Sequence, residues 1–141
     1  MVASANEARG NNKAHRPVVL LVEDETLLRE TTAEYLRLSG FAVVEAANAE
    51  EALAAFVAGE SVDVVFSDVR LAAGTMDGFR LARWVHRHHR GVPVLLTSGH
   101  GEAISAAALE GESSFVSKPY RQKSLVSRLC GLLNEARART A

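Results

Sequence analysis

The stretch that decides the fold is Val18-Val19-Leu20-Leu21-Val22-Glu23-Asp24-Glu25. Its first five residues are all aliphatic and mostly β-branched, which is typical of a strand that is covered on both faces. The apolar run ends at once in three acidic residues, so the strand is predicted to stop there. A strand that is buried on both faces indicates a parallel sheet between two layers of helices.

The alternation of a short apolar run with a helical pattern continues along the chain. Further strands are predicted at 41–44, 62–66, 94–96 and 115–117. Helices are predicted at about 27–38, 48–58, 77–89 and 103–109, and in a last segment with Leu125, Leu129 and Leu133 at helical spacing. Asn48 and Glu51 predict a capping box at the start of the second helix. Five strands alternating with five helices predict an α/β fold, a doubly wound parallel sheet with right-handed crossovers.

Length and composition define the class of protein. The chain has 141 residues, 48% hydrophobic and 23% charged, which predicts one folded domain. The net charge of −1 argues against nonspecific electrostatic binding to nucleic acid or to an anionic membrane. We expect a soluble, cytoplasmic protein with a flexible tail at 1–16, a domain at 17–138 and a short end at 139–141. Because the chain ends soon after its last predicted helix, no separate output domain is expected.

Polar side chains interrupt the apolar runs where most of the predicted strands end. In an open parallel sheet the carboxyl ends of the strands lie at one edge, where ligands bind. The side chains expected to meet there are Glu23, Asp24, Asp68, Thr97, Ser98 and Lys118. Each close pair of carboxylates costs about 4 kcal/mol at an effective dielectric constant near 20. One lysine cannot neutralise three carboxylates, so either their pKa values rise or a divalent cation joins them.

The chemistry of this cluster indicates a phosphoryl group beside a metal ion. Carboxylate oxygens suit Mg²⁺, which keeps some of its water molecules and readily shares a phosphate oxygen. A cation beside an aspartate, with a lysine and a hydroxyl aimed at the same point, neutralises the charge that spreads during phosphoryl transfer. The sequence therefore predicts a site at which a carboxylate accepts a phosphoryl group.

Four motifs at the strand ends resemble those of the receiver domains of two-component response regulators. They are Leu21-Val22-Glu23-Asp24, Phe66-Ser67-Asp68, Leu96-Thr97-Ser98 and Lys118-Pro119. The resemblance extends over residues 17–138 and implies a flavodoxin-like sheet with the strand order 2-1-3-4-5. It also implies that Asp68 is the phosphoacceptor, and that a histidine kinase or a histidine phosphotransferase is the donor.

The same resemblance implies the metal ligands. Glu23 and Asp24 would form the acidic pair that positions Mg²⁺. Asp24, Asp68 and the backbone carbonyl of Arg70 would be its direct protein ligands. The loop at 69–77 departs from the receiver pattern, because it lacks the usual proline and is longer.

A second group of residues would respond to the phosphoryl group. By resemblance, Thr97 would hydrogen-bond to it, Lys118 would pair with one of its oxygens, and Phe115 would be the aromatic switch. The peptide bond before Pro119 is expected to be cis. In similar domains the residue at the position of Gly99 flanks the attacking water molecule. A glycine there leaves the approach of this water open.

We expect a signalling module rather than a metabolic enzyme, with only magnesium-dependent self-phosphorylation and self-dephosphorylation. Its output would be contact with an unknown protein through a face within residues 103–133. The alternative is a small magnesium-dependent phosphohydrolase of the haloacid-dehalogenase type, with an aspartate nucleophile. That class needs Asp-x-Asp after the first strand, where this chain has Val22 at the first position. A nucleotide-binding module is disfavoured, because neither a P-loop motif nor a complete G-x-G-x-x-G occurs.

Three further features have both a structural and a functional interpretation. The cluster His86-Arg87-His88-His89-Arg90 is compatible with a metal site but is more typical of a basic helix end. Trp84 is a candidate for contact with a partner. The lone Cys130 excludes an internal disulfide and is expected to pack beside the last apolar stripe.

Overall fold

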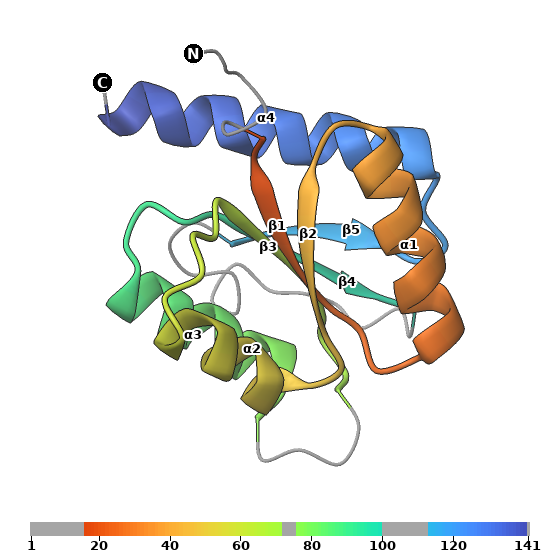
Figure 1. The fold of residues 1–141 in the computed structure, drawn as a ribbon, viewed down its shortest axis with the longest axis horizontal. Coiled ribbons are helices and arrows are strands. Elements are labelled where there is room, and N and C mark those ends of the chain that lie inside the picture. The colour runs from red at the N-terminus through yellow and green to blue at the C-terminus, as the bar shows by residue number, and fades with distance from the viewer. Residues whose placement is uncertain (1–15, 72–75, 100–112, 141) are drawn as a thin grey trace, which may run out of the picture.

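The computed structural model describes residues 16–71, 76–99 and 113–140. In these residues, five parallel strands form one sheet in the order β2-β1-β3-β4-β5, which confirms the predicted fold class (Figure 1). The described part of the chain contains four helices. The fifth predicted helix, at 103–109, lies outside the described residues, as do residues 1–15 of the predicted tail and 72–75 of the loop.

The elements largely follow the predicted ranges. The strands are β1 (Val18–Val22), β2 (Ala42–Ala46), β3 (Val64–Asp68), β4 (Val94–Ser98) and β5 (Ser113–Ser117). The helices are α1 (Thr26–Leu38), α2 (Ala49–Val57), α3 (Gly78–His88) and α4 (Gln122–Thr140). β3 and β4 end later than predicted, because their polar residues still pair with neighbouring strands, Asp68 with Thr97 and Ser98 with Ser117. A change from apolar to polar side chains therefore did not mark where these strands end.

The sheet lies between two pairs of helices. α1 and α4 cover one face, and α2 and α3 cover the other (Figure 1). Along β1, Val19 and Leu21 face the first pair of helices, whereas Leu20 and Val22 face the second. All four side chains are at most 2% exposed, as expected for a strand covered on both faces. None of the described helices has the length and apolar character of a membrane span.

The apolar stripe of α4 packs against the sheet as predicted. Leu125, Leu129 and Leu133 are buried in the core on the α1 side. The expectation that Cys130 packs beside this stripe is wrong, because its side chain is exposed. One residue is a rotation of about 100° around a helix, so Cys130 points away from the direction of Leu129.

Side-chain caps determine where two of the helices begin. Asn48 Oδ1 accepts a hydrogen bond from the N–H of Glu51 at 2.8 Å, which confirms the predicted cap of α2. Glu51 Oε1 accepts in return from the N–H of Ala47 at 2.7 Å. Asp77 caps α3 in the same way, with Oδ1 accepting from the N–H of Arg80 at 2.9 Å. These bonds satisfy N–H groups that have no partner within the helix.

Gly78 brings the first turn of α3 against the end of β3. Its N–H donates to the carbonyl of Val69 at 2.8 Å. A Cβ at this position would collide with the carbonyl oxygen of Asp68, so the close approach requires a glycine. The start of α3 and the backbone of Asp68 are therefore in direct contact.

The basic end of α3 forms an aromatic contact. The ring of His88 stacks on Trp84 at 4.7 Å between centroids, and His89 stacks on Phe56 at 4.4 Å. Within the described ranges, the group of His, Cys, Asp and Glu side chains that could hold a metal ion contains no histidine of 86–90. These contacts favour the structural interpretation of the histidine cluster. A partner contact at Trp84 stays a prediction.

Candidate functional site

The parallel strands bring the predicted polar residues to one edge of the sheet. Glu23 directly follows β1, and Asp68 is the last residue of β3. Thr97 lies in β4 next to Asp68, and Lys118 directly follows β5. Glu23, Asp68 and Thr97 are all buried. Residues that are far apart in the chain therefore meet at the point where strand order reverses.

Lys118 links the two buried carboxylates. Its Nζ donates to Asp68 Oδ2 at 2.7 Å and to Glu23 Oε1 at 3.0 Å. The N–H of Lys118 donates to the carbonyl of Ser98 at 3.0 Å, which fixes the start of its side chain. The peptide bond to Pro119 is cis, as predicted. Since hydrogen bonds between ionised groups are strong, the ammonium is held firmly beside Asp68.

Three carboxylates form an acidic cluster around Asp68. One oxygen each of Glu23, Asp24 and Asp68 lies within 4.8 Å of the others, and Asp24 is the nearest to solvent. Lys118 supplies one positive charge to this cluster, so its net charge stays negative when all three carboxylates are ionised. The oxygen atoms of these three carboxylates are ligands that suit Mg²⁺.

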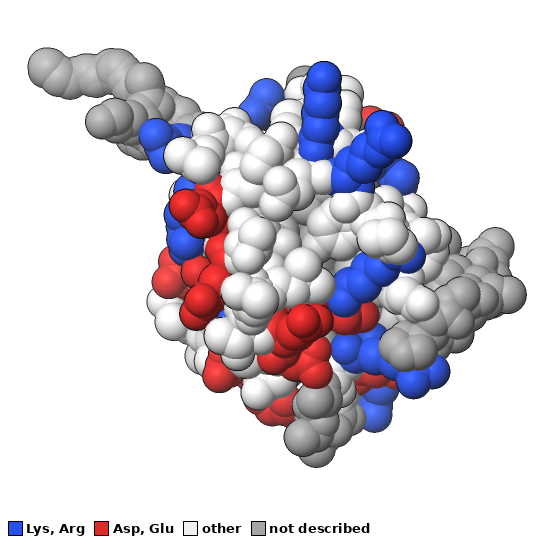
Figure 2. All heavy atoms as spheres, turned by 90° about the vertical axis from the view of Figure 1, so that its right-hand side faces the viewer, with Lys and Arg blue, Asp and Glu red and all other residues white. Residues whose placement is uncertain are grey.

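Figure 2 shows the face of the molecule on which α1 lies. Acidic side chains gather over its left and lower part, and Lys and Arg side chains lie mostly over its upper and right part.

Burial raises the pKa of Glu23 above its ordinary value of 4.5. Hydrogen bonds from the N–H of Glu25, at 3.1 Å, and from Lys118 oppose this shift, and the negative charge of Asp68 adds to it. A cation entering the acidic cluster would favour the ionised form of Glu23.

The pKa of Lys118 is also raised from its ordinary value of 10.5. Burial works against the charged ammonium, but the hydrogen bonds to Asp68 and Glu23 and the charges of both carboxylates outweigh it. Lys118 is therefore protonated at neutral pH and is available to pair with an added anion.

Thr97 has a buried hydroxyl group without a partner. The side chain is 1% exposed, and Oγ1 finds no hydrogen-bond partner among the described residues. An unsatisfied buried hydroxyl costs about 1–3 kcal/mol, so such groups are rare in folded proteins. Thr97 pairs with Asp68 in the parallel sheet, so the two side chains leave neighbouring strands on the same face.

Arg70 and Phe115 contribute differently from the other predicted site residues. The N–H of Arg70 donates to Asp68 Oδ1 at 3.2 Å, so this residue contacts the proposed acceptor through its backbone. A role for the Arg70 carbonyl in metal binding stays a prediction. Phe115 lies in β5, half-buried against the core on the α2 and α3 side. Its role as a switch also stays a prediction.

Two residues at the edge of the site were not predicted from the sequence. Arg29 in α1 donates from Nη1 to the carbonyl oxygen of Glu23 at 2.8 Å. Tyr120 lies two residues after Lys118, and its hydroxyl is 3.4 Å from Thr32 Oγ1. Burial raises the pKa of Tyr120 above its ordinary value of 10.0. Nearness in the chain was the signal for both residues, but only the folded backbone shows these contacts.

A cavity of about 490 Å³ opens beside Lys118. Leu28 and Thr32 of α1 line one side, and Pro119 and Tyr120 line the other. Lys118 lines this cavity and also belongs to the site, whereas Glu23, Asp68 and Thr97 are not among the described residues that line it.

The chain belongs to the family of response regulator receiver domains. The model of this family, described as "Response regulator receiver domain", matches residues 19–130. Receiver domains bind Mg²⁺ at an acidic pocket and are phosphorylated by histidine kinases or phosphotransferases, and this chain has an acidic cluster at the corresponding edge of the sheet. The sequence-based assignment to the receiver domains is confirmed.

Curated relatives are longer than this chain. It is 36% identical over 112 residues to the C4-dicarboxylate transport transcriptional regulatory protein DctD of Rhizobium meliloti, covering 78% of this chain and 24% of DctD. It is 33% identical over 126 residues to the transcriptional regulatory protein AruR of Pseudomonas aeruginosa, covering 86% of this chain and 51% of AruR. The chain therefore spans about a quarter to a half of these two proteins.

Solved structures of receiver domains have the same fold. The response regulator receiver protein from Sinorhizobium medicae has a TM-score of 0.81 at 25% identity, covering 87% of this chain and 98% of that chain. The receiver domain of the hybrid histidine kinase CckA has a TM-score of 0.69 at 32% identity, covering 82% and 98%. The flavodoxin-like strand order expected from the motifs is thus confirmed.

Proposed function

We propose that Asp68 accepts a phosphoryl group from a phosphohistidine and that the chain then signals by contact with another protein. The observation that carries this proposal is the ammonium of Lys118, which lies 2.7 Å from Asp68 Oδ2 and 3.0 Å from Glu23 Oε1. The unpartnered hydroxyl of Thr97 on the neighbouring strand supports it. Together they supply a nucleophile, a counter-charge and a hydrogen-bond donor at one point.

The acidic cluster would hold Mg²⁺. Glu23 and Asp24 would position the ion, and Asp24, Asp68 and the Arg70 carbonyl would bind it directly. When bound, the ion neutralises negative charge on the phosphoryl oxygens, which would otherwise repel the carboxylates. The donor set supports this assignment, because all of its members present oxygen atoms.

The transfer exchanges one bond to phosphorus for another. A carboxylate oxygen of Asp68 forms a bond to phosphorus, while the bond from phosphorus to the imidazole nitrogen of the donor breaks. The imidazole leaves with that electron pair. Lys118 then pairs with a phosphoryl oxygen, and the Thr97 hydroxyl donates to another one. Such a transfer is accelerated mainly by positioning of the reacting groups and by neutralisation of the charge on the phosphoryl oxygens.

The output would begin at Thr97. Its side chain would turn toward the phosphoryl group, and Phe115 would fill the space that it leaves. This would change a face within residues 103–133, of which 113–133 are described. A downstream protein that distinguishes the two states of this face would read the signal.

The test uses intact mass after incubation with Mg²⁺ and acetyl phosphate or phosphoramidate. Wild type should gain the mass of one HPO₃ group, and Asp68→Asn should not. Asp63→Asn is a matched control, because Asp63 lies just before β3, where its Oδ2 accepts from the N–H of Val18 at 2.7 Å. This control should be phosphorylated like wild type.

Two results would count against the proposal. One is an adduct of the same size in Asp68→Asn. The other is steady turnover of phosphate esters that does not depend on Asp68, which would favour a phosphohydrolase.

A further inference from the structure

The backbone of Glu23 is held on both sides. Its N–H donates to the carbonyl of Ala46, at the end of β2, at 3.0 Å. Its carbonyl oxygen accepts from Arg29 Nη1 at 2.8 Å. Because this carbonyl belongs to the planar peptide that leads into Asp24, its direction restricts how the Asp24 side chain leaves the backbone.

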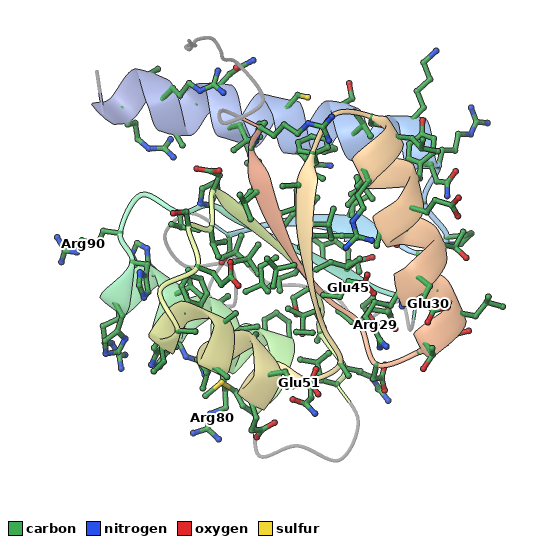
Figure 3. The ribbon with its side chains drawn as sticks, viewed as in Figure 1. Arg29, Glu30, Glu45, Glu51, Arg80 and Arg90 are labelled. Atoms are coloured by element: carbon green, nitrogen blue, oxygen red, sulfur yellow. The ribbon has the colours of Figure 1, made fainter. Side chains whose placement is uncertain are left out.

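Arg29 is in turn held by a carboxylate of the neighbouring strand. Its Nε lies 3.5 Å from Oε1 of Glu45 in β2, and its side chain is only 15% exposed. Figure 3 shows Arg29 and Glu45 next to each other in the space between α1 and β2. A guanidinium group is planar and rigid, so a contact on one side fixes the direction of its other N–H groups. Glu45 therefore keeps Arg29 aimed at the carbonyl of Glu23.

Arg37 is a natural comparison for Arg29. It lies two helical turns further along α1, and its Nη1 is 3.1 Å from Oε2 of the same Glu45. Its Nη2 donates to the carbonyl of Val43, at 3.0 Å, instead of to the backbone of the site. The two arginines share their charge, their helix and their ion-pair partner. They differ in which carbonyl group they hold.

We propose that Arg29 is a positioning residue for metal binding. Its hydrogen bond orients the peptide between Glu23 and Asp24, so that both carboxylates turn oxygens toward one cation. Arg29 acts through this peptide and not on the reacting atoms. The proposal rests on the proposed function, since it concerns the same acidic cluster.

If only its charge mattered, Arg29 would weaken Mg²⁺ binding instead of supporting it. A guanidinium group near the acidic cluster repels a dication, so its removal would tighten Mg²⁺ binding if charge were its only influence. Loss of orientation weakens binding, and groups that orient metal ligands typically contribute about tenfold or more to affinity. The direction of the change therefore distinguishes positioning from electrostatics.

The test measures the Mg²⁺ affinity of the full chain by isothermal titration calorimetry, with the melting temperature of every variant. We expect Arg29→Met and Arg29→Lys to bind Mg²⁺ about tenfold more weakly, although lysine keeps the positive charge. Arg37→Met, the matched control, should bind Mg²⁺ as well as wild type or slightly better. At saturating Mg²⁺, the Arg29 variants should be phosphorylated by acetyl phosphate at nearly the wild-type rate.

Equal or tighter binding in Arg29→Met would overturn the inference, as would equal weakening in Arg37→Met. If Arg29→Met does not fold, Arg29→Lys decides, because it keeps the positive charge but lacks the planar guanidinium group. We expect weaker Mg²⁺ binding in Arg29→Lys, and unchanged affinity would overturn the inference. A wild-type chain that binds no Mg²⁺ would instead refute the proposed function, so the two failures are distinguishable.

Discussion

Burial opposes the ionisation of the Glu23 carboxyl group. Because burial raises its pKa above 4.5 in the folded state, the unfolded chain releases this proton first as the pH rises. The stability that Glu23 contributes is therefore full below the unfolded pKa and is lost as the pH rises through the folded pKa. Glu23→Gln removes this loss.

The measurement is urea denaturation of wild type and Glu23→Gln in the absence of Mg²⁺. The unfolding free energy of the variant, relative to wild type, should increase between about pH 4 and pH 7. The same difference at both pH values would contradict the assignment of a raised pKa to Glu23.

Tyr120 predicts a second pH dependence, at the alkaline end. Its raised pKa means that the folded state favours the neutral phenol, so stability is lost as the pH rises from 10.0 through the folded value. Tyr120→Phe keeps a ring against Phe66, whose centroid lies 5.4 Å away, and abolishes this alkaline loss. Melting temperatures between about pH 8 and pH 11 test this, with Tyr35→Phe as the control for loss of another tyrosine. An unchanged alkaline slope in Tyr120→Phe would show that another group is responsible.

Arg29 and Tyr120 also show what residue patterns leave out. The acidic pair, Asp68 and Lys118 could be recognised because each interrupts or directly follows an apolar run. Arg29 acts on a backbone carbonyl, and no residue type marks that carbonyl as an acceptor. Contacts of this kind depend on how α1 lies on the sheet, which hydrophobic periodicity does not specify.

At the scale of elements, two glycines in helices should respond to alanine in opposite ways. Gly78→Ala places a methyl group against the Asp68 carbonyl, so the start of α3 has to move away from β3. Gly131 lies inside α4, and a Cβ there would meet no atom within 4 Å. Gly131→Ala should stabilise the protein by about 0.5–1 kcal/mol.

We expect Gly78→Ala to lower the free energy of unfolding by about 1–3 kcal/mol and to slow phosphorylation of Asp68. Denaturation and intact-mass kinetics on both variants check this pair of expectations. A Gly78→Ala protein with wild-type stability would mean that the contact between α3 and β3 relaxes without cost.

The elements were more predictable than their ends. The β1 run contains only side chains that suit a strand buried on both faces, and each of the four buried ones indeed lies in a core. The ends of β3 and β4 were placed too early, because Ser67, Asp68 and Thr97 are polar yet remain in the hydrogen-bonded ladder. Backbone pairing decided these boundaries, and the proposed function uses the polar residues at this edge of the sheet.

At the scale of the whole molecule, the proposed binding of Mg²⁺ would be coupled to folding. A ligand that binds only the folded state stabilises it by mass action, by about 2.7 kcal/mol at a free concentration one hundred times its dissociation constant. Mg²⁺ should therefore raise the melting temperature of wild type, and a chelator should reverse the change. Asp24→Asn should show a clearly smaller shift. An equal shift in both proteins would place the ion elsewhere.

Lys118 has a consequence for how a metal ion enters. Its ammonium already occupies the space between two of the three carboxylates, so the protein carries its own counter-ion. An incoming dication would compete with this tethered cation for the carboxylates of Glu23 and Asp68, so its net gain would be the difference between two attractions. Entry of the metal would then be an exchange of one cation for another, and the ammonium group would remain close enough to pair with a phosphoryl oxygen on Asp68.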